Sequence, residues 1–171
     1  MAHLTCADVG LLELLDEREL RRVSRCAGEA DRARMLLGAA LLRCAVGAQL
    51  GVSPVDLTVD RTCDACGGWH GRPTVPGADV DVSVSHSGAV VVVAVLAGVG
   101  RVGVDVERIQ GRSMEEVVAW TSQEARFKAG GGAGLHLYEL QPPAPGHVLT
   151  LATDQRDAAV TLLSGAALLV S

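Results

Sequence analysis

The segment 80-VDVSVSHSGAVVVVAVLAGVGRVGVDVE-107 decides the fold class, because it predicts consecutive β-strands. From Val80 to His86, valine alternates with aspartate or serine, a pattern typical of a strand with one covered face. From Ala89 to Leu96 every residue is apolar, as in a central strand that is buried on both sides. Glycines then turn the chain, and Val102 to Glu107 predicts a further strand.

Two helices are predicted before this segment, over Leu11–Arg25 and Asp31–Leu50, and the second begins with a suitable N-cap residue. Apolar residues at helical spacing predict a buried stripe on the second helix, formed by Met35, Leu36, Ala39, Leu42, Val46 and Leu50. Away from the stripe, Arg32 and Arg43 are expected to face water. Arg34 lies near one edge of the stripe.

The stretch from Asp60 to Gly77 is rich in glycine and proline and is expected to be a loop. Downstream of the central segment, a helix is predicted over Met114–Lys128 and short strands over Leu135–Leu140 and His147–Ala152. Because helices alternate with strands, the sequence predicts an α+β or an α/β fold.

The length of 171 residues predicts one domain, residues 1–171, since chains of this size bury roughly 70% of their unfolded surface. A helix-then-strands order occurs twice, in residues 1–98 and 99–171, although no sequence repeat supports a duplication. The net charge of −5 and the scarcity of aromatic residues argue against a general nucleic-acid surface. An anionic ligand must therefore be held by a few placed arginines.

The amino terminus lacks the basic start and apolar stretch of a signal peptide. The longest apolar run, Ala89 to Gly100, is too short for a membrane span, which needs about 20 residues. An odd number of scattered cysteines argues against a disulfide framework. We therefore expect a soluble protein of the reducing cytoplasm, with no membrane partner.

Lys128 is the only lysine in the chain, and it follows Glu124 by one helical turn. Lysine can release a proton where arginine cannot, so a single lysine among arginines suggests acid–base chemistry, although codon bias is an alternative explanation. Asp105 and Glu107 share one face of their predicted strand. If the helix crosses that strand, three carboxylates converge beside a cation, which suits Mg²⁺. The alternative is an ordinary polar strand face and a helical Glu–Lys pair.

Two further segments offer groups for an anion. Ser85 and His86 lie between predicted strands, where a hydroxyl, an imidazole and backbone N–H groups can receive a phosphate. A structural histidine is the alternative there. Pro73 would hold the preceding Arg72 in a defined direction.

Cys63 and Cys66 have the spacing of zinc ligands, with His70 as a possible third. No second cysteine or histidine pair completes a tetrahedron, and Cys44 would have to be recruited from a helix. A tight loop without metal is the alternative.

Four motifs follow one another in the order Gly71-Arg-Pro73, Ser83-Val-Ser-His-Ser87, Gly103-Val-Asp-Val-Glu107 and Trp120-Thr-x-x-Glu-Ala-x-x-Lys128. Together they resemble the successive signatures of the 4′-phosphopantetheinyl transferases, in the class that activates peptide and polyketide synthases. The resemblance extends upstream to Asp31–Arg43 and downstream to Leu137–Ala152.

The resemblance implies an α+β fold of two similar halves, with coenzyme A bound between them as the substrate. It implies that Asp105, Glu107 and Glu124 hold Mg²⁺ on the pyrophosphate. Glu124, directly or through water, would take the proton from a serine of an acyl or peptidyl carrier protein. Lys128 would neutralise or protonate the departing 3′,5′-adenosine bisphosphate.

The resemblance also implies a set of phosphate-binding residues. Ser85 and His86 would bind phosphates, with His86 at the 3′-phosphate, and Arg34, Arg72 and Lys128 would add positive charge.

The chain departs from the family pattern at Gln123, where relatives often have a second lysine, and in short segments after Glu107 and after Lys128. These short segments bear on carrier docking more than on coenzyme A binding. Two other functions therefore stay open: a relative that binds coenzyme A without transfer, and a structural protein with a zinc loop and no catalysis.

Overall fold

A computed structural model describes residues 1–169 and confirms the predicted α+β class. In chain order the helices are η1 (Leu4–Cys6), η2 (Val9–Leu14), α1 (Glu17–Ser24), α2 (Glu29–Leu50), η3 (Pro54–Asp56), α3 (Met114–Lys128) and α4 (Gly165–Leu169). The strands are β1 (Ala2–His3), β2 (Asp60–Thr62), β3 (Trp69–Thr74), β4 (Val80–Ser87), β5 (Val90–Ala97), β6 (Val102–Arg108), β7 (His136–Leu140) and β8 (His147–Thr153).

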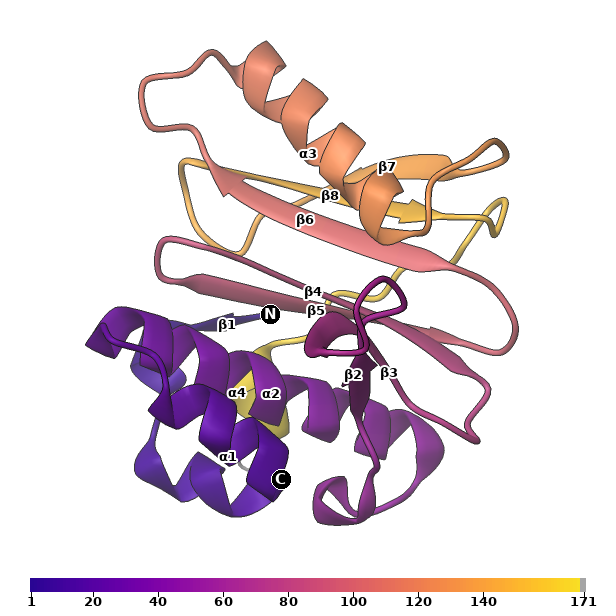
Figure 1. Cartoon of the computed structure of the whole chain (residues 1–171). Coiled ribbons are helices and arrows are strands. Elements are labelled where there is room, and N and C mark those ends of the chain that lie inside the picture. Colours follow the sequence, from indigo (N-terminus) through magenta and orange to yellow (C-terminus); the bar gives the residue numbers. More distant parts are fainter. Residues whose placement is uncertain (170–171) are drawn as a thin grey trace.

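The elements are stacked in layers, which Figure 1 shows from the side. Helices α1, α2 and α4 form the lowest layer, and above them lies an antiparallel sheet with strand order β1-β5-β4. A second antiparallel sheet, with order β6-β8-β7, lies above the first, and α3 covers it. The central position of β5 agrees with the prediction from its apolar sequence.

Helix α2 is buried on almost every side, because the first sheet covers one side and α1, η2 and α4 pack on the others. In the predicted stripe, Leu36, Ala39, Leu42 and Val46 are buried, whereas Leu50 is exposed at the last turn. By length and composition α2 could cross a membrane, but 61% of its most apolar window is buried inside the protein. That burial is typical of a core helix.

The expectation that Arg43 faces water is wrong, because its side chain is only 1% exposed. Its Nε donates a hydrogen bond to Glu19 Oε2 at 2.6 Å, and its Nη2 donates to Asp16 Oδ2 at 3.0 Å. Its Nη1 donates to the carbonyl oxygens of Pro54 and Leu57. Asp16 is also the N-cap of α1. The single helix predicted over Leu11–Arg25 is therefore divided into two helices, η2 and α1.

The stretch predicted as a loop, Asp60 to Gly77, contains the antiparallel hairpin of β2 and β3. The two strands approach closely at Gly71, where a Cβ would lie 2.8 Å from the carbonyl oxygen of Thr62. The glycine and proline content signals tight turns, and here those turns join strands.

Gly103 lets α3 lie directly on the backbone of β6. A Cβ at this position would lie 2.0 Å from the carbonyl oxygen of Ala125 and 2.6 Å from the backbone nitrogen of Ala129. Because these atoms belong to the last turn of α3 and its C-cap, only glycine fits here. The contact brings the end of α3, with Glu124 and Lys128, beside the strand that carries Asp105.

The two sheets meet along β4 and β6, which run in the same direction. Side-chain oxygens of β4 accept hydrogen bonds from backbone N–H groups of β6, with the pairs Asp81–Val102 at 2.6 Å, Ser83–Val104 at 3.0 Å, Ser85–Val106 at 3.3 Å and Ser87–Arg108 at 3.2 Å. Ser83 and Ser85 are buried. The polar face of β4 therefore faces β6 instead of water, which corrects the interpretation of β4 as a strand with only one covered face.

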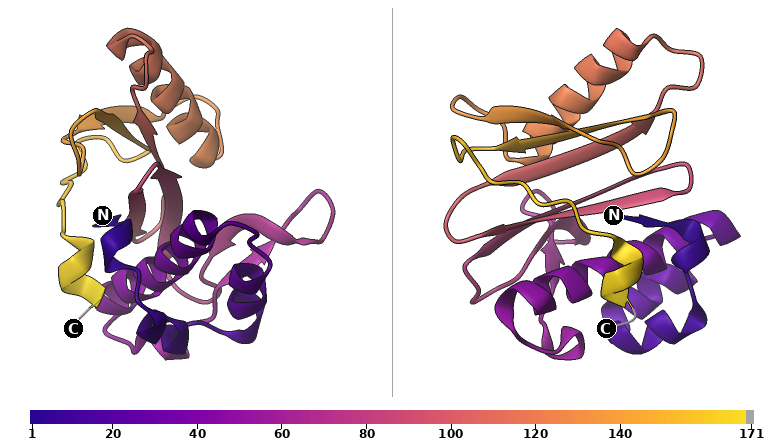
Figure 2. Two further views of the ribbon diagram at one scale, coloured as in Figure 1. Left: turned by 90° about the vertical axis from the view of Figure 1, so that its left-hand side faces the viewer. Right: turned by 180° about the vertical axis from the view of Figure 1, so that it is seen from behind.

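After β8 the chain returns to the lowest layer, as the rear view in Figure 2 shows. It ends in α4, which contacts α2 and β1. The amino terminus is held there as well, since the Met1 ammonium donates a hydrogen bond to the carbonyl oxygen of Leu163 at 3.1 Å.

Each sheet carries a helix on one face, α2 on β1-β5-β4 and α3 on β6-β8-β7. The division of a single domain into two similar halves, 1–98 and 99–171, stays a prediction. Its last two positions, 170 and 171, lie outside the described residues.

We expect Gly103→Ala to lower the free energy of unfolding by about 3 kcal/mol, because α3 must move off β6 to admit the methyl group. Urea denaturation measures the change. Gly38→Ala is the matched control: its Cβ would lie 3.6 Å from Val84 Cγ1, an ordinary contact, so it should leave stability unchanged or raise it by about 1 kcal/mol. Equal stability of the Gly103→Ala variant and the native protein would contradict the close approach.

Candidate functional site

Asp105 lies at the centre of a small polar cluster between β6, β4 and α3. Its Oδ1 accepts a hydrogen bond from Lys128 Nζ at 2.6 Å and another from the Ser85 hydroxyl at 2.7 Å. Lys128 Nζ also donates to the Ser85 hydroxyl oxygen at 3.1 Å. The only lysine of the chain is therefore paired with Asp105 rather than with Glu124, its expected helical partner.

The other carboxylate oxygen of Asp105 has no hydrogen-bond partner among the described residues, although it is buried. A buried ionised carboxylate needs compensation for both of its oxygens. Lys128 compensates one of them and stays 27% exposed itself. Oδ2 therefore lacks a compensating cation or hydrogen-bond donor within residues 1–169.

The other two predicted metal ligands lie around Asp105 but not on it. Glu107 is half-buried, and its Oε2 accepts a hydrogen bond from the Ser87 hydroxyl at 2.9 Å and lies 3.5 Å from Arg112 Nη2. Glu124 is half-buried on α3 and forms no hydrogen bond or ion pair within residues 1–169. Among the described residues, Asp105, Glu107 and Glu124 do not form a set of ligand atoms all within 4.8 Å of one another.

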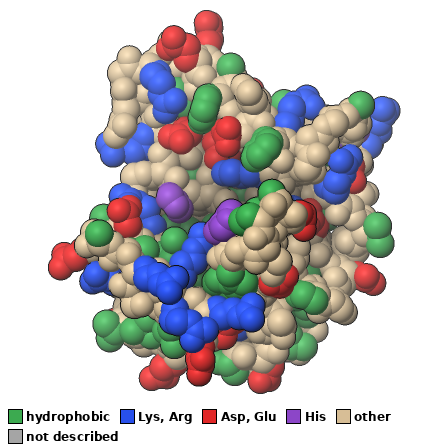
Figure 3. All heavy atoms as spheres, viewed as in Figure 1, with side chains coloured by type: hydrophobic (Ala, Val, Ile, Leu, Met, Phe, Trp, Pro, Cys, Tyr) green, Lys and Arg blue, Asp and Glu red, His purple; other side chains and the backbone are tan. Residues whose placement is uncertain are grey.

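A cationic cleft lies on the other side of β4, between α1, α2 and β2. It has a volume of about 140 Å³ and is lined by Glu19, Arg22, Arg34, Met35, Gly38, Ala39, Arg61, Val84 and His86. Figure 3 shows Lys and Arg side chains gathered on the lower part of this face, with acidic side chains above them. The predicted phosphate-binding residues Arg34 and His86 therefore come together, although they are far apart in the sequence.

Arg22 and Arg61 are the cleft residues that sequence reasoning missed. Neither guanidinium has a hydrogen bond or a salt bridge to a described residue. Burial, and then the charge of Arg22, lower the pKa of Arg61 to about 10. Glu19 also borders the cleft, but its Oε2 is bound to Arg43 at 2.6 Å. The unpaired positive charge makes this cleft suited to an anion.

The pKa of His86 lies below its ordinary value of 6.5, first because of partial burial and then because of the charge of Arg34, with a smaller effect of Lys128. The imidazole is therefore mainly neutral at pH 7. Arg34 is fixed beside it, since its Nε donates to the carbonyl oxygen of Gly88 at 2.8 Å and its Nη1 pairs with Asp31. An anion in the cleft would favour the protonated imidazole.

Two of the other predicted phosphate-binding residues have structural partners. Arg72 forms a two-pronged ion pair with Asp81, at 2.8 and 2.6 Å, and donates to the carbonyl oxygen of Val102 at 2.8 Å. It does not line the cationic cleft. Ser85 is buried and directs its hydroxyl to Asp105. Through these contacts, Arg72 and Ser85 hold the two sheets together.

A larger cavity, of about 800 Å³, lies away from these groups. It is bounded by apolar residues of β5, β6 and β8 and by the returning chain after β8, including Val92, Val104, Leu149 and Leu162. None of the candidate site residues lines it. Polar residues such as Arg156, Asp157 and Thr161 also border this cavity, but the predicted site residues lie instead at the polar cluster and the cationic cleft.

Compared with known proteins, the chain matches no protein-family model and no curated protein.

We expect the cleft to bind sulfate more tightly as the pH falls from about 7.5 to about 5.5. The free imidazole of His86 has a lowered pKa, and a bound dianion raises it, so binding takes up a proton and acid favours it. One pKa unit of change gives roughly a tenfold gain in affinity. Isothermal titration calorimetry at each pH measures the sulfate affinity. Sulfate stays fully ionised in this range, so the ligand itself does not titrate.

The matched variants are His86→Gln, which should bind sulfate with little dependence on pH, and His136→Gln on β7, which should behave like the native protein. Sulfate affinity that is independent of pH in the native protein would contradict the role of His86.

Proposed function

We propose that this protein is a Mg²⁺-dependent 4′-phosphopantetheinyl transferase that acts on coenzyme A and a carrier-protein serine in the cytoplasm. The observation that carries the proposal is the buried Asp105 oxygen without a hydrogen-bond partner, beside the only lysine of the chain. The four motifs that resemble the family contain this pair, and the cationic cleft adjoins it. We propose no nucleic-acid or membrane partner.

The 3′-phosphate end of coenzyme A suits the cationic cleft. Arg22, Arg34, Arg61 and His86 surround a volume of about 140 Å³, which is smaller than the roughly 300–1,000 Å³ of pockets for whole drug-sized ligands. The cleft therefore suits a phosphate group, with the rest of the nucleotide lying along the open surface. Unpaired guanidinium groups bind phosphate in a two-pronged manner, which favours this orientation.

The acidic residues fit a hard divalent cation. Asp105 has a buried oxygen without a partner, and Glu124 has no partner among the described residues. Glu107 Oε2 accepts a hydrogen bond from Ser87 at 2.9 Å and lies 3.5 Å from Arg112. Mg²⁺ commonly takes a few carboxylates and keeps water or phosphate oxygens in its other positions, so these ligands need not all touch the ion. When bound, the ion would neutralise charge on the pyrophosphate of coenzyme A.

The residues of α3 then supply the proton transfers. Glu124 takes the proton from the carrier serine, directly or through water, while the serine oxygen forms a bond to the β-phosphorus of coenzyme A. The bond from that phosphorus to the bridging oxygen breaks, and the electron pair leaves with 3′,5′-adenosine bisphosphate. Lys128 neutralises or protonates the leaving phosphate.

The carrier protein has an apolar surface available next to Glu124. Trp120, Glu124 and Phe127 lie at helical spacing on α3, and the two aromatic residues are 48% and 76% exposed. Exposed aromatic residues of this kind are common at the centres of protein interfaces. We propose that the carrier docks on this face of α3 and brings its serine to Glu124.

A second candidate function is coenzyme A binding without transfer. It is favoured by the pairing of Lys128 with Asp105 and by the separation of the three carboxylates. It keeps the role of the cationic cleft and removes that of the acidic residues.

We expect Glu124→Gln to reduce transfer by at least about 100-fold while coenzyme A still binds, because the amide cannot accept the serine proton. The assay incubates the protein with coenzyme A, Mg²⁺ and several apo carrier proteins, and mass spectrometry detects the phosphopantetheine adduct on serine. Glu115→Gln, in the first turn of the same helix, is the matched control and should keep full activity.

Near-normal transfer by the Glu124→Gln variant would remove Glu124 from its proposed role. Coenzyme A binding by the native protein without an adduct on any carrier would support the second candidate function.

A further inference from the structure

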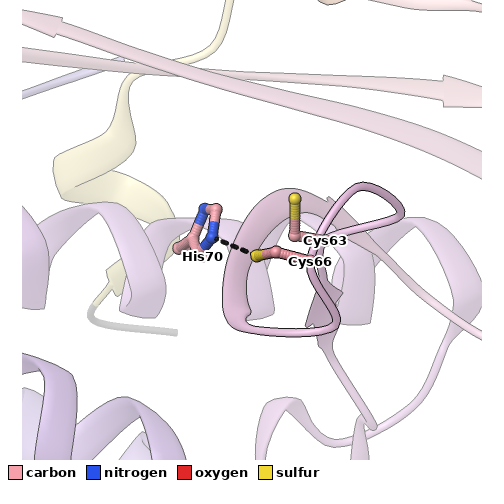
Figure 4. A group of neighbouring side chains, drawn as sticks. All are labelled: Cys63, Cys66 and His70. Atoms are coloured by element: carbon pink, nitrogen blue, oxygen red, sulfur yellow. Dashed lines mark hydrogen bonds between the residues drawn. The ribbon is translucent and has the colours of Figure 1, made fainter.

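The turn between β2 and β3 brings the side chains of Cys63, Cys66 and His70 together. Their ligand atoms all lie within 4.8 Å of one another, and this is the only such group of His, Cys, Asp or Glu in residues 1–169. Cys66 Sγ lies 3.0 Å from His70 Nε2. Figure 4 shows these two side chains pointing toward each other, with Cys63 beside them. All three residues lie at or near the surface, where an ion can enter.

The backbone of this turn supports the two sulfur atoms. The turn is closed by hydrogen bonds from Cys63 N to Gly68 O at 2.8 Å and from Gly67 N to Cys63 O at 2.7 Å. Gly67 has a φ of +70°, which glycine adopts without strain. Gly68 N donates to Cys66 Sγ at 3.4 Å. Donors directed at a sulfur stabilise the thiolate, which is the form that binds metals.

The sulfur of the other cysteine, Cys63, lies beside Cys66 and His70, within 4.8 Å of both other ligand atoms. Neither sulfur is in a disulfide. The chain thus presents a pair of sulfurs on a short turn and an imidazole nitrogen at the start of β3.

The donor set identifies the class of metal. Thiolate and imidazole favour zinc and disfavour Mg²⁺ or Ca²⁺, which prefer oxygen. Tetrahedral zinc, with bonds of about 2.3 Å to sulfur and about 2.0 Å to nitrogen, needs ligand atoms roughly 3.5–3.8 Å apart. Atoms already within 4.8 Å reach that geometry with small side-chain rotations. Three protein ligands leave the fourth position to water or a small ligand.

We propose that Cys63, Cys66 and His70 bind one Zn²⁺ ion, which fixes the β2–β3 hairpin at the edge of the cationic cleft. The hairpin carries Arg61 of the cleft on β2 and Arg72, which binds Asp81, on β3. An ion across its turn holds both arginines in place. This site does not depend on the proposed transfer reaction, because it shares no residue with the acidic cluster.

The test is equilibrium dialysis of the reduced full chain against Zn²⁺ alone, followed by metal analysis. We expect one zinc per chain, and Co²⁺ in its place should give the visible absorption bands of a tetrahedral site with thiolate ligands. Cys66→Ser and His70→Asn should each weaken zinc binding by at least about tenfold. Cys26→Ser, which changes a free cysteine outside the turn, is the matched control and should bind zinc like the native protein.

Failure of the reduced native protein to take up stoichiometric zinc would overturn the proposal. Zinc binding that Cys66→Ser and His70→Asn leave unchanged would overturn it as well. If a variant does not fold, the Co²⁺ spectrum of the native protein still tests the site. A spectrum typical of six oxygen ligands would contradict it. Transfer activity is measured separately, so its absence leaves the zinc result intact.

Discussion

The backbone N–H groups of β6 on the side that faces β4 constrain the rest of the structure. They have no partner strand there, and a buried N–H without a hydrogen bond costs about 1–3 kcal/mol. The side chains of Asp81, Ser83, Ser85 and Ser87 provide the missing acceptors at every second residue of β4. This polar join fixes the register of one sheet against the other. It also places the Ser85 and Ser87 hydroxyls beside Asp105 and Glu107.

The hydrogen bonds between β4 and β6, together with the packing of α3 on Gly103, produce a region of unbalanced charge. On one side of β4, the Asp105 carboxylate has a buried oxygen that nothing in residues 1–169 satisfies. On the other side, Arg22 and Arg61 face a cleft in which they form no ion pair, since the one carboxylate in its lining, Glu19, pairs with Arg43. A ligand that brings a cation to the first place and a phosphate to the second would satisfy both. Coenzyme A with a divalent ion has that distribution of charge.

The sequence predicted the elements that periodicity controls, and it failed where tertiary contacts decide. Helix α3 has the predicted bounds, β4 and β6 each extend one residue further at the carboxyl end, and β5 is shifted by one residue at both ends. The polar face of β4 was assigned to water because alternation cannot distinguish solvent from a neighbouring backbone. Arg43 was misplaced because its partners Asp16 and Glu19 come from another helix. Arg22 and Arg61 carry no local signal, since only the fold brings them to Arg34 and His86.

The most direct test of the central claim is the position of a metal ion in crystals grown with coenzyme A and Mn²⁺, located by anomalous scattering. The proposed site predicts an ion about 2.1 Å from Asp105 Oδ2. It also predicts that Glu107 and Glu124, or waters bound to them, surround the ion, and that the pyrophosphate lies against it. Coenzyme A bound without an ion at saturating Mn²⁺, with Lys128 still on Asp105, would contradict a metal-dependent transferase.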